Sequence, residues 1–278
     1  MNEKQQLPAK TVGGRSARLL ASLYDRSQTT FTLAEAKAIT GLSPGSTRSL
    51  LHKATLRGLI TRLKSGLFAL VPPELGSERE YSGNPYLAAR ALAGTAPYYL
   101  SHSTAMELHR MVTQPRLGIF VSMPKRMANR VIYSTEYKFI FIKPEQMFGT
   151  QPHWITKQDQ VVISDIERTV IDGLRRPEYC GGIAEVARGL WMRHEDMKVD
   201  KLVEYAAQLG IGVVRRRLGY LLELYDLAPK DKLTQLRSGL TRTYHLLDPV
   251  LPRGGKYTKR WLLQLNIPAD ELDLIRHT

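Results

Sequence analysis

The sequence predicts an α+β protein, in which a small basic N-terminal domain is joined to a larger mixed domain with a helical C-terminal part. Two observations predict this division. Helical spacing and two short alternating strands occupy residues 12–72, and a Pro- and charge-rich linker at 73–84 separates them from mixed helices and strands at 85–278. Residues 1–11 are polar, and we expect them to form a disordered tail.

The composition favours a polyanionic partner. The 278 residues include 40 Lys and Arg against 26 Asp and Glu, for a net charge of +14, and 43% are hydrophobic, enough for a substantial core. DNA, RNA and an anionic membrane surface would all attract such a chain. No apolar run approaches the ~20 residues of a membrane span, and the opening residues lack the hydrophobic segment of a signal peptide. We therefore expect a cytoplasmic protein without a membrane partner.

Three helices are predicted in the N-terminal domain. Apolar residues recur at helical spacing over 15–24 and 33–39, and the second helix stops at Gly41. A third helix is expected at 44–57, because Ser43 can cap it and its first residue is a proline, whose missing N–H costs nothing there. The order is helix, tight turn, helix.

Two short strands are expected after the third helix. Residues 59–63 alternate between apolar and polar side chains, 64–66 form a Lys-Ser-Gly turn, and 67–71 form the second strand. A helix-turn-helix followed by such a wing is a winged helix-turn-helix, which we predict for residues 12–72. Charge is concentrated before the linker, where residues 1–72 contain eleven Lys and Arg against three acidic residues.

The outward side of the third helix indicates binding to double-stranded DNA. A helix fits the major groove, where Arg can form two hydrogen bonds to guanine and Ser or His can reach base edges. We expect Arg48, Ser49 and His52 to read bases, whereas the other basic residues neutralise phosphates and release counterions. The predicted DNA-binding residues are Ser46, Thr47, Arg48, Ser49, His52, Lys53, Arg57, Arg62, Lys64 and Ser65, of which Lys53, Arg57, Arg62 and Lys64 mainly contact phosphates.

An alternative function fits the same pattern. Winged helices also serve as protein-interaction modules, in which case the basic residues form only a solvated surface. We favour DNA because these residues converge on the third helix and the wing.

From residue 85 the pattern changes. A helix at 85–93, strands at 98–100, 118–122, 131–134, 139–142 and 161–163, and mainly helices beyond Ser164 indicate an α+β domain. Ser164 and Glu167 have the spacing of a capping box, and we expect them to begin the helix that follows.

Two basic features of this domain are candidate contacts with nucleic acid or a protein partner. The loop at 123–130 carries Lys125, Arg126 and Arg130, and the helix at 213–225 carries three consecutive arginines that include Arg215 and Arg216. Consecutive helical residues cannot all face one way, so we expect at least one of the three to pair with an acidic residue. For the loop, a merely solvated hairpin is the alternative.

No catalytic or metal site is predicted. Ser101, His102 and Asp172 include the residue types of a nucleophilic site, but no GxSxG motif is present and the serines are better placed as helix caps. Neither HExxH nor GxxxxGK[ST] occurs, and the single Cys180 excludes an internal disulfide and a multi-cysteine zinc site. We therefore expect a protein that is not an enzyme and has no cofactor or metal.

Several blocks of the chain resemble one known family. They are Tyr98-Tyr99-Leu100-Ser101-His102-Ser103-Thr104-Ala105 with Glu107-Leu108-His109, the central Ser164-Asp165-Ile166-Glu167-Arg168-Thr169-Val170-Ile171-Asp172, then Arg176-Pro177-Glu178-Tyr179 with Gly181-Gly182, Arg217-Leu218-Gly219-Tyr220-Leu221-Leu222-Glu223, and Leu247-Asp248-Pro249. Together they resemble the AbiEi-type antitoxin family over nearly the whole chain, and the central block is the most specific.

This resemblance implies a type IV toxin–antitoxin system linked to abortive infection by phage. Such an antitoxin represses its own promoter by binding inverted repeats through the winged helix, and its C-terminal domain neutralises a nucleotidyltransferase-like toxin without a stable complex. Nucleotidyltransferases of this type carry a Gly-Ser followed by paired aspartates. The chain lacks this motif, which favours the antitoxin over the toxin. Two other functions stay open: a stand-alone transcriptional regulator with a ligand-sensing C-domain, and an RNA-binding or nucleotide-processing enzyme.

Overall fold

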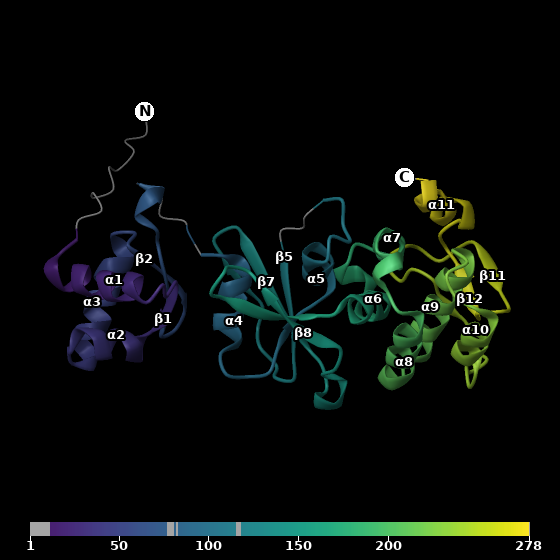
Figure 1. The fold of residues 1–278 in the computed structure, drawn as a ribbon, viewed down its shortest axis with the longest axis horizontal. Coiled ribbons are helices and arrows are strands. Elements are labelled where there is room, and N and C mark those ends of the chain that lie inside the picture. The colour runs from purple at the N-terminus through teal and green to yellow at the C-terminus, as the bar shows by residue number, and fades with distance from the viewer. Residues whose placement is uncertain (1–11, 77–80, 82, 115–117, 278) are drawn as a thin grey trace. The chain divides into compact units, whose positions relative to one another are not determined.

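The computed structural model describes residues 12–76, 81, 83–114 and 118–277 (Figure 1). The fold is mixed α+β, as predicted. The chain divides into two compact units: an N-terminal unit that ends at Thr95 and also includes Arg130–Glu136, and a C-terminal unit of Ala96–Asn129 and Tyr137–Thr278. The tail predicted at 1–11 lies outside the described residues, as do 77–80 and 82 of the predicted linker.

The N-terminal unit begins with three helices and a three-stranded antiparallel sheet (Figure 1, purple to blue). Its core contains Leu19, Leu23 and Leu51 from the helices, together with Phe31 and Phe68, whose rings stack at 5.7 Å. The elements are α1 (Gly14–Asp25), β1 (Thr30–Thr32), α2 (Leu33–Thr40), α3 (Pro44–Leu56), β2 (Ile60–Lys64) and β3 (Leu67–Leu70), with the strand order β1-β3-β2.

The turn between α2 and α3 follows from local chemistry. Gly41 ends α2 in the left-handed region, with φ of 68°, which favours glycine. Ser43 caps α3, since its hydroxyl accepts a hydrogen bond from the backbone N–H of Ser46 at 3.2 Å, and Pro44 is the first helical residue. The predicted stop at Gly41 and the predicted start at Ser43 and Pro44 are therefore confirmed.

The boundary between the units lies later than the expected end of the linker at residue 84. Helix α4 (Pro85–Ala93) groups with the N-terminal unit and packs against β2 and β3, burying Leu87 and Leu92. Before it, η1 (Pro73–Leu75) is a short 3-10 helix within the predicted linker. The apolar face of α4 thus covers the sheet of the smaller unit instead of starting the larger one.

A six-stranded sheet follows, with the order β6-β7-β5-β4-β9-β8. Strand β4 runs antiparallel to β5 and parallel to β9, which in turn runs antiparallel to β8. The strands are β4 (Tyr99–Leu100), β5 (Gly118–Met123), β6 (Arg130–Ile132), β7 (Thr135–Phe141), β8 (Thr150–Trp154) and β9 (Gln160–Ser164), and α5 (His102–Leu108) lies between β4 and β5 in the chain. The strand β8 was absent from the sequence-based prediction.

Helices follow β9, as expected, and end in a small sheet that was not expected. They are α6 (Ile166–Arg175), α7 (Ile183–Met192), α8 (Val199–Leu209), α9 (Gly212–Leu224), α10 (Lys230–Arg237) and α11 (Ala269–Asp273). The sheet contains β10 (His245–Leu246), β12 (Leu263–Leu265) and β11 (Lys256–Thr258), in that order. Trp261 is buried directly against Gly219 of α9, where any Cβ would collide with its ring.

The start of α6 corrects the predicted capping box. Asp165 is the N-cap, since its carboxylate accepts from the backbone N–H of Arg168 at 2.8 Å. Ser164 lies within 2.8 Å of the Thr169 hydroxyl instead, and the buried Glu167 accepts from Lys201 at 3.0 Å. The sequence pattern placed the N-cap one residue too early, at Ser164, because aspartate caps a helix as well as serine does.

A charged network is buried between α6 and β4. The Arg168 guanidinium donates to Asp172 at 3.0 Å and to the Tyr99 hydroxyl at 3.0 Å, and that hydroxyl donates to Asp172 at 2.9 Å. The Phe148 ring lies 4.2 Å from the guanidinium carbon. Burial raises the pKa of Tyr99 above its usual value, and the neighbouring Asp172 adds to this, so the hydroxyl stays protonated as a donor.

We expect Asp172→Ala to lower the free energy of unfolding of the C-terminal unit by about 3–5 kcal/mol, because Arg168 would keep a buried charge without its partner. Urea unfolding followed by tryptophan fluorescence measures this unit selectively, since Trp154, Trp191 and Trp261 all belong to it. The control Glu145→Ala removes one partner of the exposed Lys143–Glu145 ion pair and should change stability by less than about 0.5 kcal/mol. An equal effect of the two variants would contradict the role assigned to Asp172.

Candidate nucleic-acid interface

Helix α3 presents a polar and basic face to solvent. Ser46, Arg48, Ser49, His52 and Lys53 are all exposed, and the opposite face is buried in the core of the unit. Capping by Ser43 and Pro44 sets where the helix begins and therefore which side chains face outward. This part of the predicted site is arranged as a single accessible surface.

Thr47 does not belong to that surface. Its side chain is fully buried, with 0% exposure, and its hydroxyl donates to the Ser43 carbonyl at 2.9 Å. The prediction of a DNA contact for Thr47 is therefore wrong. At 100° per residue, position 47 shares the inner face of α3 with Leu51 and Ala54.

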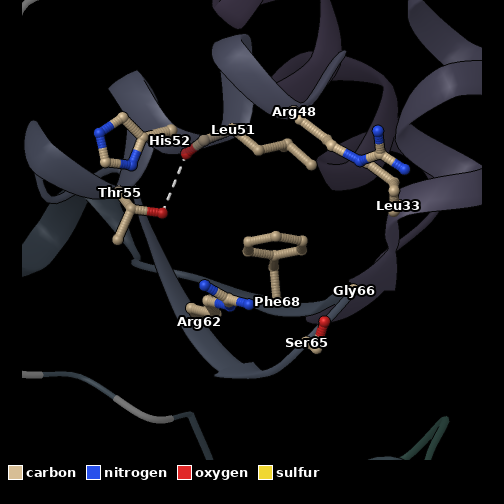
Figure 2. Close-up of a pocket in the computed structure, with 9 residues that line it drawn as sticks. All are labelled: Leu33, Arg48, Leu51, His52, Thr55, Arg62, Ser65, Gly66 and Phe68. Atoms are coloured by element: carbon tan, nitrogen blue, oxygen red, sulfur yellow. Dashed lines mark hydrogen bonds between the residues drawn. The ribbon is translucent and has the colours of Figure 1, made fainter. Parts of the chain in front are cut away.

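A groove lies between α3 and the β2–β3 hairpin (Figure 2). It has a volume of about 460 Å³, and Figure 2 shows Arg48 from α3 and Arg62 from β2 on either side of the Phe68 ring. His52 lies at the α3 side and Ser65 at the hairpin turn. The described lining contains no carboxylate; its residues are Leu33, Arg48, Leu51, His52, Thr55, Arg62, Ser65, Gly66 and Phe68.

The hairpin is held in place beside the helices. Gly66 adopts φ of 73° in its turn, a conformation that favours glycine, and its carbonyl accepts from the backbone N–H of Leu33 at 2.9 Å. This bond attaches the hairpin turn to the start of α2. A backbone bond therefore positions the hairpin turn beside Leu33, which also lines the groove.

The remaining predicted residues of this unit lie away from the groove. Ser46, Ser49 and Lys53 are exposed on α3 but do not line it, and Arg57 is the C-cap of the helix. The Lys64 ammonium donates to the Leu92 carbonyl at 2.8 Å, so it links β2 to α4. The ammonium that we predicted to contact phosphates therefore bonds to α4 within the protein.

Sequence reasoning missed five residues of the groove: Leu33, Leu51, Thr55, Gly66 and Phe68. One signal was available for Thr55, because positions 48, 51, 52 and 55 have the spacing of a single helical stripe. Phe68 gave no such signal, since an apolar residue in a strand is ordinarily core.

The candidate cations of the C-terminal domain differ in accessibility. Lys125, Arg126 and Arg130 are exposed, and the Arg126 guanidinium lies 4.6 Å from the centre of the Phe141 ring. Arg216, by contrast, is 1% exposed and donates to the Thr241 carbonyl at 2.6 Å. It therefore does not offer the surface contact that we predicted.

The three consecutive arginines all bond to backbone carbonyls. Arg215 donates to the carbonyls of Gln235 and Ser238, and Arg217 donates to the Leu174 carbonyl at 2.7 Å. Among the described residues, none of the three forms an ion pair, so the expected pairing with an acidic residue is wrong. These bonds join α9 to the segments packed around it.

The chain is similar to the crystal structure of the RV2827C protein from Mycobacterium tuberculosis, with a TM-score of 0.68 over 91% of this chain and 92% of that chain. The two share 16% sequence identity, so the likeness shows a common fold. No protein-family model and no curated protein matches the chain.

Two further properties bear on the site. Within the described residues, no helix is long and apolar enough to cross a membrane. No cluster of three or more His, Cys, Asp or Glu side chains that could hold a metal ion occurs in the same part of the chain.

We expect Ser43→Ala to destabilise α3 by about 1 kcal/mol, because the N–H of Ser46 loses its acceptor. Hydrogen exchange of protected α3 amides should then accelerate about fivefold through more frequent local opening. Ser49→Ala is the matched control, since it removes an exposed hydroxyl from the middle of the same helix and alanine favours helices. Unchanged exchange in Ser43→Ala would contradict this account of the cap.

Proposed function

We propose that the chain is a DNA-binding antitoxin of a type IV toxin–antitoxin system. In this proposal, residues 12–72 act as a winged helix-turn-helix that represses the protein's own promoter, and the C-terminal domain neutralises a nucleotidyltransferase-like toxin. The observation that carries the DNA-binding part is the groove between α3 and the β2–β3 hairpin, in which Arg48, His52 and Arg62 surround one opening.

The chemistry of this groove suits duplex DNA. A helix with an exposed arginine in its N-terminal half can enter the major groove and direct that arginine at a guanine edge. Arg48 has this position on α3, and His52 follows it by one turn. Arg62 extends from the hairpin, where a flanking phosphate backbone would lie, and each neutralised phosphate adds salt-dependent affinity.

The toxin-neutralising part rests on the sequence blocks that resemble the AbiEi-type family. The likeness to the mycobacterial structure supports a fold that extends across both units, since it covers 91% of the chain. The sequence contains none of the motifs GxSxG, HExxH and GxxxxGK[ST], and this supports a role without catalysis.

We expect Arg48→Ala to relax the preference for one base pair of the operator, at a cost of about 1–3 kcal/mol, because a bidentate base contact is lost. Arg62→Ala should weaken operator and unrelated DNA alike and reduce the slope of log K against log salt by about 1. Titration of promoter DNA and base-substituted duplexes at several salt concentrations measures both effects.

The control for these variants is Arg18→Ala, which removes an exposed arginine of α1 that does not line the groove. It should leave base preference unchanged. Wild-type binding by both Arg48→Ala and Arg62→Ala would remove the assignment of this groove to DNA.

We also expect repression and neutralisation to separate genetically. The double variant Arg48→Ala/Arg62→Ala should lose repression of a promoter–reporter fusion, yet still restore growth when it is co-expressed with the nucleotidyltransferase-like toxin that the proposal requires. The physical reason is that the two activities use different units. Failure of the wild-type chain to restore growth would contradict the antitoxin function, and equal loss of both activities in a stably expressed double variant would contradict their separation.

A further inference from the structure

A second basic site lies wholly within the C-terminal unit. A pocket of about 420 Å³ is lined by Arg175 and Arg176 at the end of α6, Arg217 of α9 and Arg253, together with Tyr244 and His245. The one carboxylate in the described lining is Glu178, which already pairs with Arg176 at 3.2 Å. Four arginines therefore line one pocket against a single carboxylate, which gives it an excess of positive charge.

Arg217 is recessed in this pocket and has no ion-pair partner among the described residues. It is 4% exposed, and its hydrogen bonds go to the neutral carbonyls of Leu174 at 2.7 Å and Leu246 at 3.1 Å. Its Nε is buried without a hydrogen-bond partner. Burial lowers the pKa of Arg217 to about 10. A buried cation of this kind is unfavourable until an anion approaches it.

Two carboxylates compensate this charge only in part, since Asp248 and Glu178 raise the pKa of Arg217 whereas burial lowers it more. Asp248 accepts from the backbone N–H groups of Ile183 at 2.7 Å and Val250 at 2.8 Å, so its oxygens serve the loop that carries it. Arg175 likewise donates to a neutral group, the Gln146 side-chain carbonyl, at 3.1 Å. The pKa of His245 is lowered by burial and then by Arg216 and Arg217, because nearby positive charge disfavours the protonated imidazole.

We infer that this pocket binds a small phosphorylated molecule, with its phosphate group directed at Arg217 and Arg175. Guanidinium forks match the geometry of phosphate oxygens, and several of them can share one dianion. The volume is that of a small-molecule site. Tyr244 offers a partly exposed ring beside the charged groups, on which a flat organic group could stack.

The recessed position of Arg217 favours a small molecule over a nucleic-acid backbone. A terminal phosphate can enter a pocket, whereas a phosphodiester within a duplex is substituted on both sides and is contacted by protruding cations. This site is independent of the α3 groove and goes beyond the proposed function, because it adds a ligand to the C-terminal domain.

The test is isothermal titration of the full chain with inorganic pyrophosphate and, separately, with AMP at constant ionic strength. We expect one saturable site per chain, weakened about tenfold by Arg253→Ala and by Arg176→Ala, since a hydrogen bond to a charged group is lost in each. Both arginines are exposed, so the unfolding midpoint should not change. Arg237→Ala, an exposed arginine of the same unit outside the pocket, should bind as the wild type does.

The two probes distinguish the source of the phosphate. Tighter binding of AMP that is lost in Tyr244→Ala identifies a nucleotide, and tighter binding of pyrophosphate identifies a polyphosphate. Nuclear magnetic resonance gives a second measurement, since a bound anion should raise the pKa of His245. No saturable binding at millimolar concentration, equal weakening by Arg237→Ala, or displacement of the probe by a short DNA duplex would overturn the inference.

Discussion

The C-terminal unit is organised around one buried ion pair. Arg168 and Asp172 lie one turn apart on α6, and Tyr99 bonds to both of them from β4. Two charges removed from water must satisfy each other, because an isolated buried charge costs several kcal/mol. The network therefore fixes α6 against the central sheet. This position of α6 also places Arg175 and Arg176, at its C-terminal end, in the lining of the second basic pocket.

The blocks that resemble the AbiEi-type family are mostly internal. Tyr99, Arg168 and Asp172 form the buried network, Gly219 gives room to Trp261, and Asp248 holds the start of α7. Such residues specify a fold, and partner recognition depends on the surfaces that this fold presents. Two kinds of arginine then differ in exposure: Arg48 and Arg62 of the α3 groove are exposed, whereas Arg217 is buried at the second basic pocket.

Local signals explain what could be predicted and what could not. The turn from α2 to α3 was predictable because Gly41, Ser43 and Pro44 act through their own backbone within a few residues. The bond from Lys64 to Leu92 and the carbonyl partners of the three consecutive arginines were not predictable, since each depends on a segment distant in sequence. Arg217 alone is paired with carbonyls 43 and 29 residues away.

The amino-acid sequence by itself therefore determined the mixed α+β class, the positions of the first three helices and the basic outer face of α3, because periodicity and capping are encoded within single turns. Only the tertiary structure decided that α4 covers the sheet of the N-terminal unit, that Arg48 and Arg62 share one groove, and that Arg175, Arg217 and Arg253 converge on one pocket. These arrangements depend on burial and on packing between segments far apart in the chain, and no short stretch of sequence carries that information.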